Sequence, residues 1–366
     1  MFAFDPRFWH ARRVLVTGHT GFKGAWLTLW LAGLGARVTG LSLPPHTDPS
    51  LFALCARDKC TDLCGDIADA ALVARVLADC QPEIVIHMAA QALVRPSYAD
   101  PLGTYATNVM GTANVLQAAR SVGSVRALLV VTSDKVYEND GTGRLFAEGD
   151  RIGGHDPYSS SKACAEIVTH SFRQCFFEGS CRVATARAGN VIGGGDWSPF
   201  RVVPDIVAAF AAGEPVALRY PTAVRPWQHV LDPLAGYLML AQAMVTEPQS
   251  APATLNFAPD ADSFRSVSEL VQAFTALWGG RPGWRLDGGE HPREASLLTL
   301  DATRARTTLG WRPLLPFDDA VAWTADWYQA FRNGDDVGAV TRGQIAMFAQ
   351  RLARPQSNRT QLRGTA

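Results

Sequence analysis

The chain has 366 residues, in which 34 Lys and Arg balance 34 Asp and Glu, and 47% of the residues are hydrophobic. This length suits one large or two modest domains with an ample apolar core. The zero formal charge argues against nucleic acid or an anionic membrane surface as the principal partner.

Targeting and metal signals are weak in this sequence. Residues 1–6 have neither the basic segment nor the apolar run of a signal peptide, and no segment approaches the roughly 20 apolar residues of a membrane span. The seven cysteines are scattered, and Cys55, Cys60 and Cys64 do not form a Cys-x-x-Cys pair. We therefore expect a cytoplasmic protein without a metal site.

The first predicted elements are a strand at residues 13–17, a glycine turn and an apolar helix that ends near Gly33 or Gly35. In this context Gly18 allows a tight turn, Gly21 lets a diphosphate approach, and Gly24 lets the helix pack on the strand. The spacing is looser than Gly-x-Gly-x-x-Gly, so a purely structural turn is the alternative. The candidate cofactor ligands here are Gly18, Thr20, Gly21, Phe22, Lys23 and Gly24.

The next two strands add further cofactor candidates. The strand at residues 37–43 contains Ser42 but ends in neither an acidic residue nor an arginine, so the choice between NAD and NADP is weakly determined. Asp66 and Ile67 lie at the end of a short predicted strand and could contact the edge of an adenine ring. The strand that begins at residue 83 ends in small or polar residues that leave room for a nicotinamide ribose: Ala89, Ala90 and Gln91.

A predicted helix at residues 101–122 has one buried polar candidate, Asn108, for which a satisfied core amide is as plausible as a site role. The apolar run at residues 128–131 then predicts a buried strand that leads directly into Thr132, Ser133, Asp134 and Lys135. Ligands of open α/β sheets bind at the carboxyl ends of the strands, so this polar stretch is a candidate site. An ordinary polar exit from the strand is the alternative.

Tyr158 and Lys162 lie four residues apart on a helix predicted at residues 157–178, and therefore on one face. An ammonium beside a phenol should lower the phenol pKa and create a general base. Such a pair occurs by chance in many helices. Its position one connection after the strand that ends in Ser133 favours a catalytic role.

Beyond a strand at residues 182–187, which exits through Asn190, the alternation of strands and helices breaks. Helices are predicted at residues 202–212, 233–245, 267–277, 303–309, 317–334 and 340–352, with short strands at 216–219 and 254–258. Three arginines of this part, Arg201, Arg219 and Arg225, suit a diphosphate because the guanidinium bonds oxygens in pairs. His229 ends a stretch, residues 221–229, that we expect to be a loop.

Together these patterns predict an α/β fold with a Rossmann-type doubly wound parallel sheet and a smaller, interleaved C-terminal substrate-binding lobe. We expect a nucleotide-binding domain at residues 8–190 and a lobe at 191–335 with some return to the main domain. Residues 336–366 should form a terminal helix and a disordered tail.

The glycine turn, Asp66-Ile67, Ala89-Ala90, Asn108, Ser133 and the Tyr158/Lys162 pair together resemble the extended short-chain dehydrogenase/reductase superfamily. More narrowly, residues 18–24, 132–135 and 225–230 are similar to the CDP-glucose 4,6-dehydratase family, over roughly residues 8–333. One departure falls at residues 291–295, His-Pro-Arg-Glu-Ala, where the family tends to carry Pro-His-Glu-Ala.

This resemblance implies NAD as cofactor and a nucleotide sugar as substrate. Tyr158, helped by Ser133 and Lys162, would take the proton of the sugar 4-hydroxyl while hydride passes from C4 to NAD. Asp134 would act as the acid and Lys135 as the base that remove water across C5 and C6. Each needs the protonation state opposite to that of the free residue, so the exchanged roles, or one shared proton, stay open.

The resemblance also implies substrate contacts and an oligomer. The candidate substrate ligands are Asn190, Arg201, Arg219, Arg225 and His229. The helices at residues 101–122 and 157–178 match those that pair subunits in the superfamily, which implies a homodimer or a larger assembly. The alternatives are a dehydratase of a dTDP-, GDP- or UDP-hexose, an epimerase or reductase of the same fold, and a non-catalytic NAD sensor.

Overall fold

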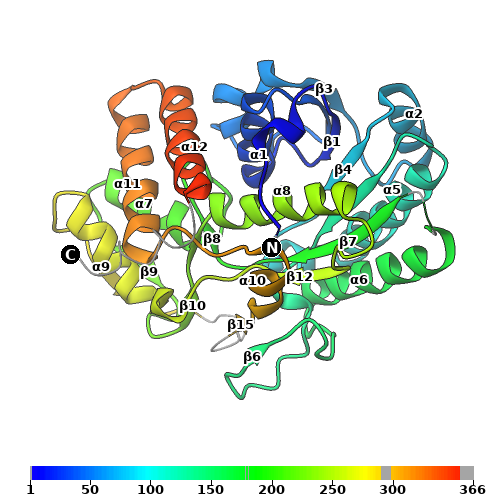
Figure 1. Ribbon diagram of the computed structural model, residues 1–366. Coiled ribbons are helices and arrows are strands. Elements are labelled where there is room, and N and C mark those ends of the chain that lie inside the picture. The colour runs from blue at the N-terminus through cyan, green and yellow to red at the C-terminus, as the bar shows by residue number, and fades with distance from the viewer. Residues whose placement is uncertain (1, 178, 180, 290–297, 355–366) are drawn as a thin grey trace.

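The computed structural model describes residues 2–177, 179, 181–289 and 298–354, and a seven-stranded parallel sheet forms its centre (Figure 1). The strand order is β12-β7-β5-β4-β1-β2-β3. The strands are β1 Arg13–Thr17, β2 Arg37–Ser42, β3 Thr61–Cys64, β4 Ile84–His87, β5 Ala127–Val131, β7 Arg182–Arg187 and β12 Thr254–Asn256. This order confirms the predicted Rossmann-type sheet.

Both faces of the sheet are buried, as the apolar strands predict. Successive residues alternate between faces, so Val14 and Val16 belong to one core cluster while Leu15 belongs to the other. Helices α1 Phe22–Gly33 and α8 Leu231–Thr246 cover the first face. Helices α2 Ala70–Cys80 and α5 Gly111–Arg120 cover the second, and α6 Pro157–Phe176 packs beside α5.

The helix predicted at residues 101–122 is divided in the structure. It consists of α4 Pro101–Tyr105, a π-helical turn η4 Ala106–Met110 and α5, and α3 Val94–Ala99 precedes it. The wider turn centres on Asn108, whose buried amide bonds groups outside the helix. The three segments are continuous, so the predicted helix is confirmed from residue 101 to 120, and the external bonds of Asn108 accompany a local change of helical pitch.

The C-terminal half contributes a second lobe with helices α7 Val202–Ala211, α9 Val267–Leu277 and α11 Phe317–Asn333. Outside the large sheet, the strands form short pairs: β9 Val216–Leu218 with β14 Trp284–Leu286, β10 Val224–Pro226 with β13 Phe264–Ser266, β8 Val191–Ile192 with β11 Gln228–His229, and β6 Leu145–Phe146, from the first half of the chain, with β15 Thr299–Leu300. The expected loop at residues 221–229 is thus corrected, since it contains β10 and β11.

Several late segments return to the half of the molecule that contains the large sheet. Strand β12 joins the edge of the large sheet, α8 crosses it, and α10 Thr303–Leu309 packs on α8 (Figure 1). The last helix, α12 Val337–Ala353, packs against α1, where the rings of Trp30 and Phe348 lie 5.6 Å apart. The domain boundaries themselves stay a prediction.

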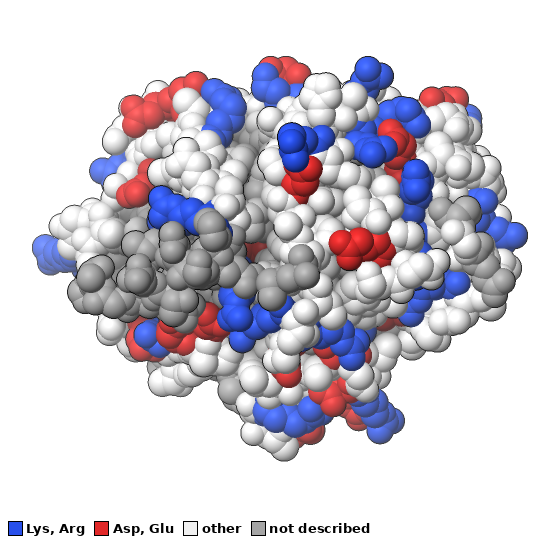
Figure 2. Space-filling view, viewed as in Figure 1, with Lys and Arg blue, Asp and Glu red and all other residues white. Residues whose placement is uncertain are grey.

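The surface carries charges of both signs. Figure 2 shows Lys and Arg interspersed with Asp and Glu over the described part of the face in view. Within the described ranges, none of the helices has the length and hydropathy needed to cross a membrane. All seven cysteines are free thiols, and the described residues contain no cluster of potential metal ligands. The predicted disordered tail falls mostly on residues 355–366, which lie outside the described residues.

Candidate active site

The segment that follows β5 forms a tight turn at the carboxyl edge of the sheet. Ser133 caps the 3-10 turn η5 Asp134–Val136, and its Oγ accepts a hydrogen bond from the Lys135 amide at 3.2 Å. The same hydroxyl donates to Asp134 Oδ1 at 2.9 Å. A serine favours this position because its oxygen satisfies an amide that the turn leaves free. Three consecutive reactive residues are thereby held together.

Asp134 is buried, whereas the Lys135 side chain is half-buried. The Asp134 carboxylate packs directly on the α-carbon of Gly189, which follows β7. A Cβ atom added to Gly189 would lie 2.0 Å from Asp134 Oδ2. Glycine is thus the residue that leaves space for this carboxylate, and the sequence analysis did not single it out.

Tyr158 and Lys162 project from the first two turns of α6. Asp156 caps this helix by accepting the Ser159 amide at 2.9 Å, and Pro157 occupies the first turn, where no amide hydrogen is needed. The Tyr158 amide donates to Ser97 Oγ at 3.1 Å. Both Tyr158 and Lys162 are buried, and they lie one helical turn apart as predicted.

Burial controls the charges of this pair. It raises the pKa of the Tyr158 phenol, and the hydrogen bond with Ser133 opposes this rise. Burial also lowers the pKa of Lys162 to about 8, against the charge of Glu166. The Lys162 ammonium donates to Val131 O at 3.2 Å. The expected lowering of the phenol pKa was therefore wrong, because desolvation of the phenolate raises this pKa more than the hydrogen bond with Ser133 and the charge of Arg201 lower it.

A buried ion pair lies behind the catalytic segment. Arg187 of β7 donates to both carboxylate oxygens of Glu166 at 2.8 and 2.9 Å, and both side chains are at most 5% exposed. Thr132 Oγ1 and Thr185 Oγ1 donate to the same carboxylate at 2.6 and 2.7 Å. The position of Glu166, four residues after Lys162, is the sequence signal that could have revealed it.

The glycine turn has the geometry of a diphosphate site. Gly18 has a φ of +78°, and a Cβ there would lie 2.6 Å from the Ala89 amide nitrogen. A Cβ on Gly24 would lie 2.1 Å from Gly18 O, so α1 packs tightly on the turn. Helix α1 begins after Gly21 without a side-chain cap, which leaves its first amides available to an anion.

The other candidate cofactor residues surround this turn. Thr20 Oγ1 and Ser42 Oγ lie 2.8 Å apart at the end of β2. Asp66 and Ile67 follow β3, Ala89, Ala90 and Gln91 follow β4, and Thr132 follows β5. Asn108 accepts the Gln91 amide at 2.8 Å and donates to Ser161 Oγ at 2.8 Å. Asn108 is thus a satisfied core amide that braces the residues after β4 against α6.

Lys23 connects the glycine turn to the catalytic charges. Its ammonium lies 5.9 Å from the centre of the Tyr237 ring on α8. Burial lowers the pKa of Lys23 to about 8, helped by the positive charge of Arg201 and opposed by that of Asp134. A site that gathers several cations in this way suits anionic ligands.

Among the predicted substrate residues, Arg201 acts electrostatically on the candidate catalytic groups. Its Nη1 donates to Asp196 Oδ2 at 2.8 Å, and its charge lowers the pKa of Tyr158. Asp196 is in turn held by Tyr328 of α11, whose hydroxyl donates to Asp196 O at 2.5 Å. The sequence analysis missed Asp196 and Tyr328, because α11 is distant in the chain.

The remaining predicted substrate residues are dispersed. Asn190 follows β7 in a left-handed conformation with a φ of +49°. Arg219 follows β9 and Arg225 lies in β10, both on the second lobe. His229 is corrected: its ring has no exposed surface and lies between the rings of Trp26 and Trp323, so it belongs to the core. The departure at residues 291–295 lies outside the described residues.

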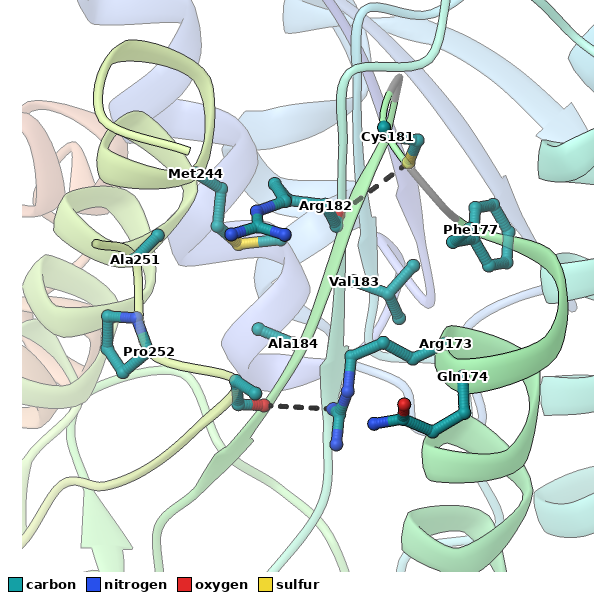
Figure 3. A pocket seen from close by; sticks show the side chains of 12 residues that line it. Arg173, Gln174, Phe177, Cys181, Arg182, Val183, Ala184, Met244, Ala251 and Pro252 are labelled. Atoms are coloured by element: carbon teal, nitrogen blue, oxygen red, sulfur yellow. Dashed lines mark hydrogen bonds between the residues drawn. The ribbon is translucent and has the colours of Figure 1, made fainter. Parts of the chain in front are cut away.

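A cavity of about 430 Å³ opens elsewhere, where β7 begins and α6 ends (Figure 3). Arg173, Arg182 and Met244 line it, and Arg173 Nη1 donates to Ala253 O at 3.3 Å. The start of β7 is the edge of the sheet opposite to Ser133 and Tyr158. This cavity is therefore separate from the candidate active site.

Comparison with known proteins gives consistent matches. A model of the NAD dependent epimerase/dehydratase family matches residues 14–254. The CDP-glucose 4,6-dehydratase of Salmonella typhimurium is 42% identical over 357 residues, which cover 96% of this chain and 99% of that protein. A dTDP-glucose 4,6-dehydratase of Xanthomonas campestris pv. campestris is 31% identical, over 86% of this chain and 92% of that protein.

A solved structure agrees with the fold. The dTDP-glucose 4,6-dehydratase DesIV from Streptomyces venezuelae, solved with NAD and TYD bound, superposes with a TM-score of 0.76 and 26% sequence identity. The match covers 88% of this chain and 98% of that one. The resemblance therefore extends over both the sheet and the second lobe.

Proposed function

Because the chain belongs to the NAD dependent epimerase/dehydratase family, we propose that it is a lyase that converts CDP-D-glucose to CDP-4-keto-6-deoxy-D-glucose and water. The observation that carries this proposal is the turn after β5, where Asp134 and Lys135 adjoin Ser133 and lie with Tyr158 at one edge of the sheet. An oxidation of C4 requires only Ser133, Tyr158 and Lys162, so the acid and amine serve a second reaction.

NAD is the proposed cofactor, and the residues present fit it. The uncapped amides of α1, the close packing of Gly18 and Gly24, and the nearby Lys23 ammonium suit a dinucleotide diphosphate. When bound, NAD accepts hydride from C4 of the sugar and later returns it to C6. Because the reaction has no net oxidation, we expect the cofactor to stay bound between turnovers.

In the proposed oxidation, Tyr158 removes the proton of the sugar 4-hydroxyl. The Ser133 hydroxyl favours the phenolate form by its hydrogen bond, as its effect on the Tyr158 pKa indicates. The Lys162 ammonium, fixed to Val131 O, supplies a positive charge on the same helical face. General base catalysis of this kind typically contributes a rate factor of about 10²–10⁴.

In the proposed elimination, Lys135 removes the C5 proton, which the 4-ketone makes acidic, and Asp134 protonates the departing 6-hydroxyl. Asp134 is buried against Gly189, which holds its carboxyl in the same turn as Lys135. The exchanged assignment uses the same two side chains. In either assignment, Asp134 and Lys135 must both face the hexose from the η5 turn.

The test is incubation of the purified protein with CDP-, dTDP-, GDP- and UDP-glucose, followed by mass spectrometry. We expect CDP-glucose to lose one water without added nicotinamide, and deuterium placed at C4 to appear at C6. A product of unchanged mass would indicate an epimerase instead. Efficient turnover of dTDP-glucose would favour the second candidate, a dTDP-glucose 4,6-dehydratase, which the 31% identical relative supports.

The proposal extends to substrate contacts, assembly and compartment. Asn190, Arg201, Arg219 and Arg225 are the proposed substrate ligands. A homodimer is supported by exposed apolar side chains on α4 and α6, among them Leu102 at 81% and Ile167 at 56% exposure. Free thiols support the cytoplasm, where cysteines stay reduced.

A further inference from the structure

One buried ion pair holds both ends of the segment that carries the reactive side chains. At the first end, Thr132 Oγ1 donates to Glu166 Oε1 at 2.6 Å. At the other end, Arg187 Nη1 donates to the phenol oxygen of Tyr137 at 2.7 Å. Because Glu166 and Arg187 are bonded to each other at 2.8 and 2.9 Å, the segment between residues 132 and 137 is anchored twice to the same pair.

The Tyr137 phenol is itself rigidly placed. Its hydroxyl donates to Asn256 Oδ1 at 2.8 Å, and its ring stacks on Phe146 with centroids 5.2 Å apart. Asn256 Nδ2 donates in turn to Phe146 O at 2.9 Å and Asp301 O at 3.1 Å. The side chain is only 2% exposed, so it is too deep to contact a sugar and acts through its neighbours.

The two anchors serve different parts of the site. Ser133 follows Thr132 directly, and Lys162 and Tyr158 are held by separate bonds to Val131 O and Ser97 Oγ. Lys135 instead lies inside the turn that the Tyr137 amide closes by donating to Asp134 O at 3.4 Å. Ser133 therefore depends on the first anchor, Tyr158 and Lys162 are held independently of the second, and the position of Lys135 depends on the second.

We propose that Tyr137 is a positioning residue for the elimination of water. Its hydroxyl fixes the far end of the η5 turn, so that the Lys135 amine and the Asp134 carboxyl reach C5 and C6 of the same bound sugar. This inference rests on the proposed dehydration. It assigns a role to a residue that takes part in neither proton transfer.

The test is the variant Tyr137→Phe, which removes one oxygen atom and keeps the ring stack. We expect water loss to slow by about 10- to 100-fold, as for a small misplacement of reacting groups, with the oxidation of C4 unchanged. On mixing with CDP-glucose, the absorbance of reduced nicotinamide should then accumulate in the variant. Exchange of the sugar C5 hydrogen with deuterated solvent should slow in parallel with water loss.

The matched control is Thr324→Val, which removes a fully buried hydroxyl whose bond among the described residues is to Ala320 O within α11. We expect C4 oxidation and water loss to proceed at wild-type rates in this control variant. The inference is overturned if Tyr137→Phe loses water at the wild-type rate, or if both steps slow equally. Failure of the wild-type protein to release water from any of the four nucleotides would instead contradict the proposed function.

Discussion

The contact between Gly189 and Asp134 makes the acid position sensitive to a single methyl group. A Cβ atom on residue 189 would lie 2.0 Å from Oδ2, a distance at which the carboxylate must move. We predict that Gly189→Ala lowers kcat for water loss by about 100-fold, because a displacement near 1 Å costs roughly this factor. Steady-state kinetics with CDP-glucose measures the effect.

Gly123→Ala is the control for this change, since no heavy atom lies within 4 Å of a Cβ placed there. It should leave kcat and the melting temperature unaltered. A Gly189→Ala enzyme with normal kcat would show that Asp134 does not have to occupy its present position.

The hydrogen bond between Ser133 and Tyr158 gives the oxidation a defined pH dependence. It favours the phenolate, against the burial that raises the pKa of Tyr158. Removing it in Ser133→Ala should raise this pKa further, so that fewer phenols are ionised at a given pH. We predict that the rate of C4 oxidation falls and that its rise with pH moves to more alkaline values, measured in single-turnover experiments. An unshifted profile would exclude Tyr158 as the group that titrates.

Sequence reasoning could propose reactive residues because their signals are local. Ser133, Asp134 and Lys135 are consecutive after an apolar strand, and Tyr158 and Lys162 have helical spacing. Gly189 and Arg187 were missed because they reach the site from β7 through tertiary packing. The error over the Tyr158 pKa and the error over His229 have the same cause, since burial depends on the whole fold.

At the scale of elements, the buried Asp232 links α8 by hydrogen bonds to the segment that precedes α11. Asp232 Oδ1 in the first turn of α8 accepts the Leu314 amide at 2.6 Å, and Asp232 O accepts Trp311 Nε1 at 3.0 Å. Burial raises the pKa of Asp232 to about 8, whereas an aspartate of an unfolded chain titrates near 3.9. Between these two pKa values, the folded protein therefore keeps a proton on Asp232, whereas the unfolded chain releases it.

This difference makes the stability of the protein depend on pH. The contribution of the protonated carboxyl is complete below about pH 4, declines as the pH rises, and is lost above the folded pKa of about 8. The decline is at most about 1.4 kcal/mol per pH unit. We predict that Asp232→Asn, which cannot ionise, gains stability relative to the wild type between pH 5 and 8 in urea unfolding. The prediction would be contradicted if the free energy of unfolding changed with pH in the same way for both proteins.

The element boundaries predicted from the sequence match the structure where hydrophobic periodicity and capping residues agree. The helix expected at residues 267–277 has those bounds as α9, and Ser266 and Glu269 form a capping box at its start. The helix expected at 101–122 is present over residues 101–120, but its π-helical turn was not predicted because the bonds of Asn108 to Gln91 and Ser161 are long-range. Hydrophobic periodicity does not distinguish a π-helical turn from a regular one.

At the scale of the whole molecule, elements that are far apart in the sequence pack against one another. Strand β12 is the edge of the first sheet, α8 covers that sheet, and α12 returns to α1. The amphipathic pattern of residues 340–352 predicts a helix with an apolar face but does not identify α1 as its partner. The sequence could therefore predict interleaving in general terms, and the specific contacts required the structure.

The exposed apolar side chains next to α6 determine the last prediction. Tyr98, Leu102, Met110 and Ile167 are each at least 54% exposed, and they lie on α6 or on segments that pack against it. Exposed apolar side chains gathered around one helix favour an interaction surface there, and α6 also carries Tyr158 and Lys162. An isologous pairing across α6 would cover these side chains in both subunits and rigidify the helix that carries Tyr158 and Lys162.

We predict that the wild-type protein is a dimer in light scattering and that Ile167→Lys shifts it to a monomer, because an ammonium would be buried at the interface without a partner. Leu286→Lys is the control, since Leu286 is 62% exposed on β14 in the second lobe. A monomeric wild type would contradict the predicted dimer, and a dimer that survives Ile167→Lys but not Leu286→Lys would place the subunit contact elsewhere. Because Lys162 lies within two turns of Ile167, dissociation should also lower the rate of C4 oxidation, which links assembly to the first chemical step.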